Sequence, residues 1–260
     1  MTRSLLFVPA KEKMLNKISS FSSNGYIIDL EDSIIEEEKD DALNCLCDFL
    51  HGNKTNNTLF VRLNKERYSM EAKTLSKFNV GFMLPKFESP DYYGQLVDIW
   101  NQHNIIALVE TPRGVVNILE IANCVWVDAI AFGAEDFTAS MNMQNNDAYL
   151  QSIKTTLVTY AKAFNKQIFD TPSFKISEQD DFEKEVENSV SLGFDGKLLI
   201  NPKQIECVNK HFSEVDLDYL AYLVSEYDRR GEAVTIIDNK VYEKMHINRF
   251  RRIIKEHNSD

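Results

Sequence analysis

Several features that define large protein classes are missing from this sequence of 260 residues. No apolar run approaches the roughly 20 residues needed to span a bilayer, and the apolar run within the N-terminal MTRSLLFVPA is too short for a signal peptide. Positive charge is also scarce: 29 Lys and Arg residues stand against 40 Asp and Glu residues, a net charge of −11. This balance argues against broad nucleic-acid binding, which needs a basic face, although local basic residues can still bind a small anion. We therefore expect a cytoplasmic protein with no membrane or nucleic-acid partner.

Cysteine is equally sparse, and no two cysteines have CxxC spacing. The four are Cys45, Cys47, Cys124 and Cys207. Cys45 and Cys47 lie two apart on an expected helix and so do not share a face. We expect reduced core thiols and no disulfide, redox or metal role for them.

What the sequence does contain is a series of short apolar runs, separated by stretches with helical periodicity. There are eight such runs: Ser4–Pro9, Gly25–Asp32, Thr58–Asn64, Val80–Lys86, Asn104–Thr111, Val127–Asp136, Lys166–Pro172 and Gly196–Pro202. They are nearly continuous in apolar character, as parallel strands covered on both faces require. Eight strand–helix units predict a (β/α)8 barrel, an α/β fold, over residues 1–212.

Helices are expected in the gaps between these runs and in the tail. The predicted ranges are Glu12–Ser22, Glu36–Leu50, Lys65–Phe78, Pro90–Gln102, Gly114–Asn123, Ala148–Asn165, Glu178–Leu192 and Lys203–Lys210. Residues 213–260 form a C-terminal extension with helices at Leu217–Arg230 and Lys244–His257 and an extended AVTIID between them. The amphipathic extension packs on a neighbouring subunit or on its own barrel, and the sequence leaves both open.

Polar side chains gather at the C-terminal ends of the predicted strands. They are Asp29, Glu31, Asp32, Arg62, Asn64, Lys86, Glu110, Glu135, Asp136, Asp170 and Asn201. Active sites of (β/α)8 barrels are built at these ends, and the N-terminal ends carry no comparable series. The alternative, that polarity simply resumes before each loop, explains one or two such residues but not a set of this size.

Two of these carboxylates suggest a metal. Glu110 and Asp136 end adjacent predicted strands, which lie roughly 4.8 Å apart, and two carboxylates plus waters or substrate oxygens are how Mg²⁺ is usually held. None of the five histidines falls at a predicted strand end, which disfavours metals that prefer imidazole. A structural salt bridge to Arg62 or Lys86 is the alternative.

Arg62 offers a rigid fork that can bind a carboxylate through two hydrogen bonds. A cation beside an arginine suits an α-keto acid, and deprotonation next to the carbonyl gives an enolate whose charge the metal takes up. This is the electron sink needed to make or break a carbon–carbon bond. A Schiff-base aldolase using Lys86 is a second hypothesis, and a non-catalytic protein that retains a keto-acid or metal site is a third.

Seven short motifs, in the order and at the intervals typical of one family, give the sequence a family resemblance. They are DLEDS at 29–33, VRLN at 61–64, LPK at 84–86, ETPRG at 110–114, FGAEDF at 132–137, FDTP at 169–172 and GFDGKLLINPKQI at 193–205. Together they resemble the citrate lyase β-subunit-like branch of the HpcH/HpaI aldolase superfamily. The resemblance implies a Mg²⁺-dependent (β/α)8 lyase, with Mn²⁺ as an alternative ion, that acts on acyl-CoA, acyl-carrier or keto-acid substrates. It also implies a homo-oligomer, a trimer or a hexamer.

By the same resemblance, individual residues acquire roles. Glu110 and Asp136 are the expected metal ligands and Arg62 the clamp on the substrate carboxylate. The other expected substrate-binding residues are Lys86, Asn64, Ala134 and Glu135. Asp32 stands where the keto-acid aldolase branch has a histidine that acts through water as the base, so it is a general base or a helix N-cap. Asp29 and Glu31 would hold the waters of the cation or the Arg62 fork, and all three acids are counted as catalytic.

The sequence also departs from the family pattern. Relatives that bind coenzyme A usually have glycine where this chain has Ala10, which puts a close backbone approach to pantetheine in doubt. Lys11 and Lys13 could attract phosphates or lie solvated on a helix. Glu243 stands where longer relatives carry an aspartate for thioester hydrolysis, so hydrolase activity is doubtful. Whether the acyl group is carried by CoA or by a carrier protein is left open.

Overall fold

The computed structural model describes residues 2–52, 58–144, 147–174, 179–213 and 217–257. They form two compact units, residues 1–212 and 213–260. Within the described chain, no helix is both long enough and apolar enough to cross a bilayer.

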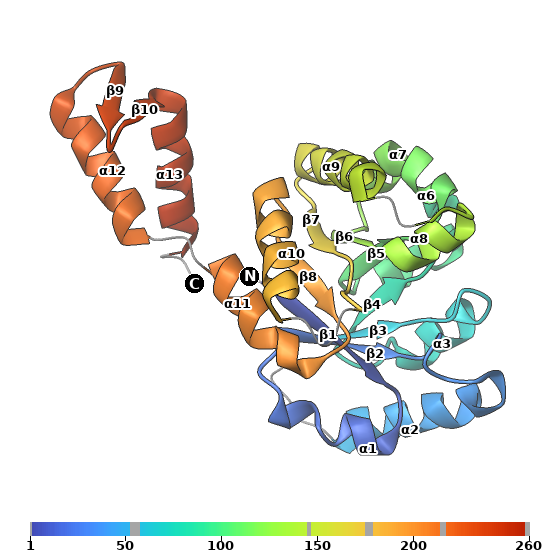
Figure 1. Ribbon diagram of the computed structural model, residues 1–260. Coiled ribbons are helices and arrows are strands. Elements are labelled where there is room, and N and C mark those ends of the chain that lie inside the picture. The colour runs from blue at the N-terminus through green and yellow to red at the C-terminus, as the bar shows by residue number, and fades with distance from the viewer. Residues whose placement is uncertain (1, 53–57, 145–146, 175–178, 214–216, 258–260) are drawn as a thin grey trace. The chain divides into compact units, whose positions relative to one another are not determined.

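The first unit is a closed barrel of eight parallel strands, each paired with the next in the sequence (Figure 1). The strands are β1 Ser4–Pro9, β2 Gly25–Asp29, β3 Thr58–Arg62, β4 Gly81–Leu84, β5 Ile105–Val109, β6 Ala129–Phe132, β7 Gln167–Asp170 and β8 Gly196–Leu199. β8 closes the barrel against β1, from the pair Ser4–Lys197 to the pair Leu6–Leu199. The predicted fold class is therefore confirmed.

Alternate residues of each strand fill the barrel interior. Leu5, Ile27, Phe60, Met83, Ile106, Leu108, Ala129, Ala131, Phe169 and Leu198 form this inner cluster. The residues between them belong to a larger cluster that packs against the surrounding helices. Because side chains alternate along a strand, the same parity sends the side chains of Asp29, Arg62 and Glu110 inward at the end of their strands.

Helices cover the outside of the barrel in every interval between strands (Figure 1). They are α1 Glu12–Leu15, η1 Ile18–Ser20, η2 Glu36–Glu38, α2 Lys39–Gly52, α3 Tyr68–Leu75, α4 Pro90–Tyr93, η3 Gly94–Leu96, α5 Val97–Trp100, α6 Pro112–Val116, α7 Ile118–Asn123, α8 Ala134–Ser140, α9 Asp147–Ala163, α10 Gln179–Leu192, η4 Pro202–Gln204 and α11 Ile205–Ser213. Several predicted single helices are broken into short segments, as in Pro90–Gln102, where α4, η3 and α5 follow one another.

One correction bears on function. The predicted sixth strand ran to Asp136, but β6 ends at Phe132 and helix α8 begins at Ala134. Glu135 and Asp136 therefore lie in the first turn of a helix, where negative side chains interact favourably with the helix dipole.

The second unit consists of α12 Leu217–Arg230, the hairpin β9 Val234–Ile237 and β10 Lys240–Glu243, and α13 Lys244–His257. Both helices have the predicted bounds. The hairpin was only half foreseen, because β10 was not predicted; its two-residue turn places Asp238 and Asn239 at φ 49° and 62°, the left-handed conformation that such turns require.

Candidate active site

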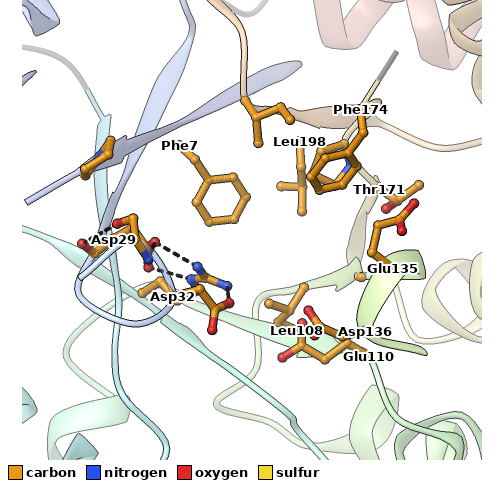
Figure 2. A pocket seen from close by; sticks show the side chains of 16 residues that line it. Phe7, Asp29, Asp32, Leu108, Glu110, Glu135, Asp136, Thr171, Phe174 and Leu198 are labelled. Carbon is orange, nitrogen blue, oxygen red and sulfur yellow. Dashed lines mark hydrogen bonds and ion pairs between the residues drawn. The ribbon is translucent and has the colours of Figure 1, made fainter. Parts of the chain in front are cut away.

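A cavity of about 380 Å³ opens at the C-terminal end of the barrel. It is lined by Phe7, Pro9, Asp29, Asp32, Ser33, Arg62, Leu108, Glu110, Gly133, Glu135, Asp136, Thr171, Pro172, Phe174, Leu198 and Ile200. Figure 2 shows an apolar side with Phe7, Leu198 and Phe174, an arginine–acid cluster, and a separate pair of carboxylates. Most of the residues predicted to form the site meet in this cavity.

The carboxylate pair is Glu110, which follows β5, and Asp136 in α8. Glu110 is 2% exposed, and its Oε1 accepts a hydrogen bond of 2.7 Å from the backbone N–H of Lys86. Burial, together with the negative charges of Glu31 and Asp136, raises the pKa of Glu110 to about 8, although the hydrogen bond from Lys86 acts to lower it. In the described part of the chain neither carboxylate is in a salt bridge, so the predicted structural alternative, a bridge to Arg62 or Lys86, is wrong for this pair.

Gly133 makes room for this pair. A Cβ atom at Gly133 would lie 2.7 Å from Oε2 of Glu110, closer than real Cβ contacts allow. Its position directly after β6 would otherwise direct a side chain inward. Glycine is therefore needed here so that the Glu110 carboxylate can occupy the mouth of the barrel.

Lys86 has a strained backbone at the same edge, with φ 46°. Non-glycine residues rarely adopt this left-handed conformation, and it directs the N–H of Lys86 toward Glu110. Its Nζ lies 3.9 Å from Oε1 of Glu31. Although partial burial opposes it, the acids around Lys86, with Glu31 first, raise the pKa of the ammonium group.

Arg62 is the centre of the second cluster. Its Nε and Nη2 donate to the two carboxylate oxygens of Asp29 at 2.7 and 2.8 Å, and its Nη1 donates to Asp32 at 2.8 Å. Nη1 also lies 3.2 Å from Oε2 of Glu31, and the guanidinium carbon is 5.1 Å from the centre of the Phe7 ring. Asp29 and Glu31 therefore both contact the arginine fork, one of the two roles expected for them.

Asp29 and Glu31 have pKa values shifted in opposite directions, and Asp32 differs from both in its exposure to solvent. Burial acts to raise the pKa of Asp29, but the hydrogen bonds and charge of Arg62 outweigh it and lower that pKa. Burial raises the pKa of Glu31 to about 7, because the charge of Arg62 only partly compensates. The side chain of Asp32 is 59% exposed, against 4% for Asp29 and 9% for Glu31. Asp32 is thus the acid that can most easily leave the arginine.

One alternative for Asp32 is wrong. It does not cap a helix, since the next helical segment is η2, whose N-cap is Ile35. Asp32 lies in a turn and contacts Arg62.

Two other strand-end residues turn away from the cavity. Asn64 is 1% exposed, and its Nδ2 donates to the Leu30 carbonyl and to Glu71. Asp170 is fully buried among α9, α10 and β8. Both were expected at the mouth. Asp170 has outward parity, because its neighbour Phe169 faces the barrel interior. Asn64 has inward parity but lies two residues beyond the end of β3, where its hydrogen bonds to Leu30 and Glu71 hold it away from the cavity.

Ala134 and Glu135 lie at the edge of the site. Glu135 lines the cavity, and the N–H of Ala134 donates to Oγ1 of Thr171 at 3.1 Å. Thr171 was not singled out from the sequence, and neither was the apolar side formed by Phe7 and Leu198. Phe7 on β1 and Leu198 on β8 could have been identified as cavity residues from the alternation of inward and outward side chains along these strands.

The donors at this site suit Mg²⁺. Glu110 and Asp136 supply oxygen ligands only, and across the described ranges no group of three or more His, Cys, Asp or Glu side chains could hold a metal. A hard cation that keeps water or substrate oxygens as its other ligands is what two carboxylates can hold. Zinc-type sites, built from imidazole or thiolate, do not match this donor set.

Known proteins resemble this chain over most of its length. The model of the family described as HpcH/HpaI aldolase/citrate lyase matches residues 3–202. Citrate lyase subunit beta of Leuconostoc mesenteroides subsp. cremoris is 26% identical over 283 residues, 99% of this chain and 94% of that protein. The (3S)-malyl-CoA thioesterase of Cereibacter sphaeroides is 28% identical over 259 residues, 94% of this chain and 90% of that protein. The citrate lyase beta subunit of M. tuberculosis, solved with oxaloacetate and magnesium, is 27% identical with a TM-score of 0.73, covering 81% of this chain and 96% of that one.

Proposed function

Because the chain belongs to the HpcH/HpaI aldolase/citrate lyase family and is by class a carbon–carbon lyase, we propose that its cavity holds Mg²⁺ on Glu110 and Asp136. The substrate we propose is a β-hydroxy acyl thioester or a hydroxy keto acid. One observation carries this proposal: two carboxylates with no salt bridge among the described residues face the same cavity as Arg62. The M. tuberculosis structure with magnesium and oxaloacetate supports it.

The residues of the cavity have different proposed roles in binding the ion and the substrate. Glu110 and Asp136 would hold the Mg²⁺ ion, which would supply positive charge to stabilise negative charge on a substrate oxygen. A substrate carboxylate takes the place of Asp32 on Nη1 of Arg62, because Asp32 is the exposed partner. Asp29 keeps the guanidinium in position through its two hydrogen bonds.

Asp32, once the substrate carboxylate has replaced it on Arg62, transfers the proton. In cleavage it accepts, through a water, the proton of the β-hydroxyl as the carbon–carbon bond breaks, and the bonding electrons move onto the α-carbon of the leaving fragment. The same carboxyl then returns a proton to that carbon, so that the reaction is balanced without a co-reactant.

The carrier of the acyl group belongs to the proposal as well. The name of the Cereibacter relative indicates a CoA thioester for that protein, and we propose CoA thioesters first for this chain. Ala10 is buried and its N–H donates to the carbonyl of Asp29 at 3.1 Å, so the first loop is held against β2.

The decisive experiment measures Mg²⁺ binding and cleavage together, by calorimetry and by keto-acid release from a panel of β-hydroxy acyl thioesters. Glu110→Gln and Asp136→Asn should each abolish both, whereas Glu135→Gln, a neighbouring acid of the same cavity, should retain Mg²⁺ affinity. Full turnover in the presence of EDTA, with loss of activity on borohydride trapping, would replace this proposal with a Schiff base at Lys86. Oxaloacetate or pyruvate binding without turnover of any thioester would favour the non-catalytic alternative.

A further inference from the structure

A buried ionic cluster lies outside the cavity, between β7 and β8 on one side and helices α9 and α10 on the other. Asp170 and Lys197 are paired across the β7–β8 ladder. Their chain neighbours Phe169 and Leu198 face the barrel interior, so both side chains point outward. They are 0% and 1% exposed.

The Asp170 carboxylate is held from three elements. Lys197 of β8 donates to Oδ2 at 3.1 Å, Lys154 of α9 lies 2.9 Å from Oδ1, and Ser189 of α10 donates to Oδ2 at 2.6 Å. A well-packed apolar cluster often stabilises a core as much as a buried ion pair does. Stability alone therefore does not account for a lysine at this position.

Lys197 has a second contact that an apolar residue could not make. Its Nζ donates to the backbone carbonyl of Thr171 at 2.7 Å. The ladder between β7 and β8 ends at the pair Asp170–Lys197, so Thr171 is the first residue beyond it. The lysine thus holds the chain of β7 one residue past the end of the sheet.

Thr171 in turn contacts the helix that carries Asp136. Its Oγ1 accepts the N–H of Ala134 at 3.1 Å, and Ala134 is the first residue of α8. The N-cap of α8 is Gly133, which has no side chain to accept this bond. Figure 2 shows Thr171 on the same edge of the cavity as Glu135.

From this chain of contacts we propose that Lys197 is a positioning residue for the metal site. It fixes Thr171, which caps α8 and so holds the Asp136 carboxylate in place. The inference rests on the proposed function, because it assigns Asp136 to the ion.

The test compares Lys197→Met with Lys166→Met. Lys166 is the matched control, since its Nζ also donates to backbone carbonyls, those of Cys124 and Val127, but at the N-terminal end of β6. We expect Lys197→Met to raise the Mg²⁺ dissociation constant about fivefold, as loss of one hydrogen bond would, and to speed hydrogen exchange of the Ala134 amide in the ion-free protein. Lys166→Met should change neither.

A second pair of variants shows whether the effect passes through Thr171. Thr171→Val should reproduce both changes and Thr171→Ser, which keeps the hydroxyl, should not. The double variant of Lys197→Met with Thr171→Val should bind Mg²⁺ no more weakly than the worse single variant. If Lys197→Met does not fold, the Asp170→Leu/Lys197→Met protein, which lacks both members of the pair, carries the same measurements.

Two outcomes would overturn the inference: unchanged Mg²⁺ affinity and Ala134 exchange in Lys197→Met, or additive effects in the double variant. Failure of the wild-type protein to bind Mg²⁺ would instead overturn the proposed function. The exchange rate of Ala134 would then still decide whether Lys197 holds the start of α8.

Discussion

The affinity for Mg²⁺ should depend steeply on pH, because one proposed ligand is protonated near neutral pH. Burial raises the pKa of Glu110 to about 8, and a carboxyl group must lose its proton to coordinate a metal. Mg²⁺ binding below pH 8 therefore releases a proton from Glu110.

The size of the effect follows from that pKa. The apparent dissociation constant scales as one plus ten to the power of pKa minus pH. This factor is about 100 at pH 6, about 11 at pH 7 and about 1.1 at pH 9. Affinity should thus increase roughly 90-fold between pH 6 and pH 9, with about 0.9 proton released per ion at pH 7.

Without Mg²⁺, the free energy of unfolding should decrease as pH rises, whereas the affinity for Mg²⁺ increases. The folded pKa of Glu110 lies above its unfolded value of 4.5. The stability that this raised pKa contributes is present below pH 4.5 and is lost as pH rises through about 8. Since the ion binds the charged form, the increase in Tm on adding Mg²⁺ should grow over the same range.

Calorimetry in two buffers of different ionisation enthalpy measures both the affinity and the released proton. The Glu110→Gln protein should bind Mg²⁺ weakly at every pH. The Glu135→Gln protein should show the same dependence of Mg²⁺ affinity on pH as the wild type. Equal dissociation constants at pH 6 and pH 9, or no proton release at pH 7, would refute the assignment of Glu110 as a buried ligand.

Three further substitutions test other parts of the site and fold. Gly133→Ala should abolish Mg²⁺ binding, measured by calorimetry, because its Cβ would lie 2.7 Å from Oε2 of Glu110; wild-type affinity would contradict the steric argument. Asp170→Asn should lower the free energy of unfolding by about 3–5 kcal/mol at pH 7, measured in urea, since it removes the negative charge that pairs with the buried Lys197 and the partly buried Lys154. Burial acts to raise the pKa of Asp170, but the charges of Lys197 and Lys154 lower it to about 2, so the stability that Asp170 contributes is present above pH 3.8 and is lost as pH falls toward about 2. Equal free energies of unfolding for the wild type and Asp170→Asn at pH 7 would contradict this prediction. Lys86→Gly should stabilise the ion-free protein by up to about 1 kcal/mol by relieving its φ of 46°, and a lower Tm would show that its side chain matters more.

Much of the fold could be predicted because parallel strands buried on both faces have a distinct composition. Runs such as Ile105–Val109 are apolar at every position, and each is followed by a helix. Eight repeats then allow only a few closed arrangements. The helix boundaries were harder, because short helices such as α4 and α5 depend on tertiary packing more than on periodicity.

The sequence predicted which residues lie at the site better than it predicted how their side chains are arranged. Proximity to a strand end identified Arg62 and Glu110, but also Asp170, whose side chain faces the helices. Side-chain parity separates these cases and can be read from the sequence once strand ends are known. The saturation of Arg62 by three acids could not be predicted, because it depends on how the turn after β2 folds back over β3.

The lining of the cavity contains five carboxylates and a single arginine. An approaching anion therefore meets repulsion, and an approaching dication meets attraction, before either makes contact. Occupancy should be sequential for that reason, with the cation entering first and converting the mouth from a barrier to organic acids into a receptor for them.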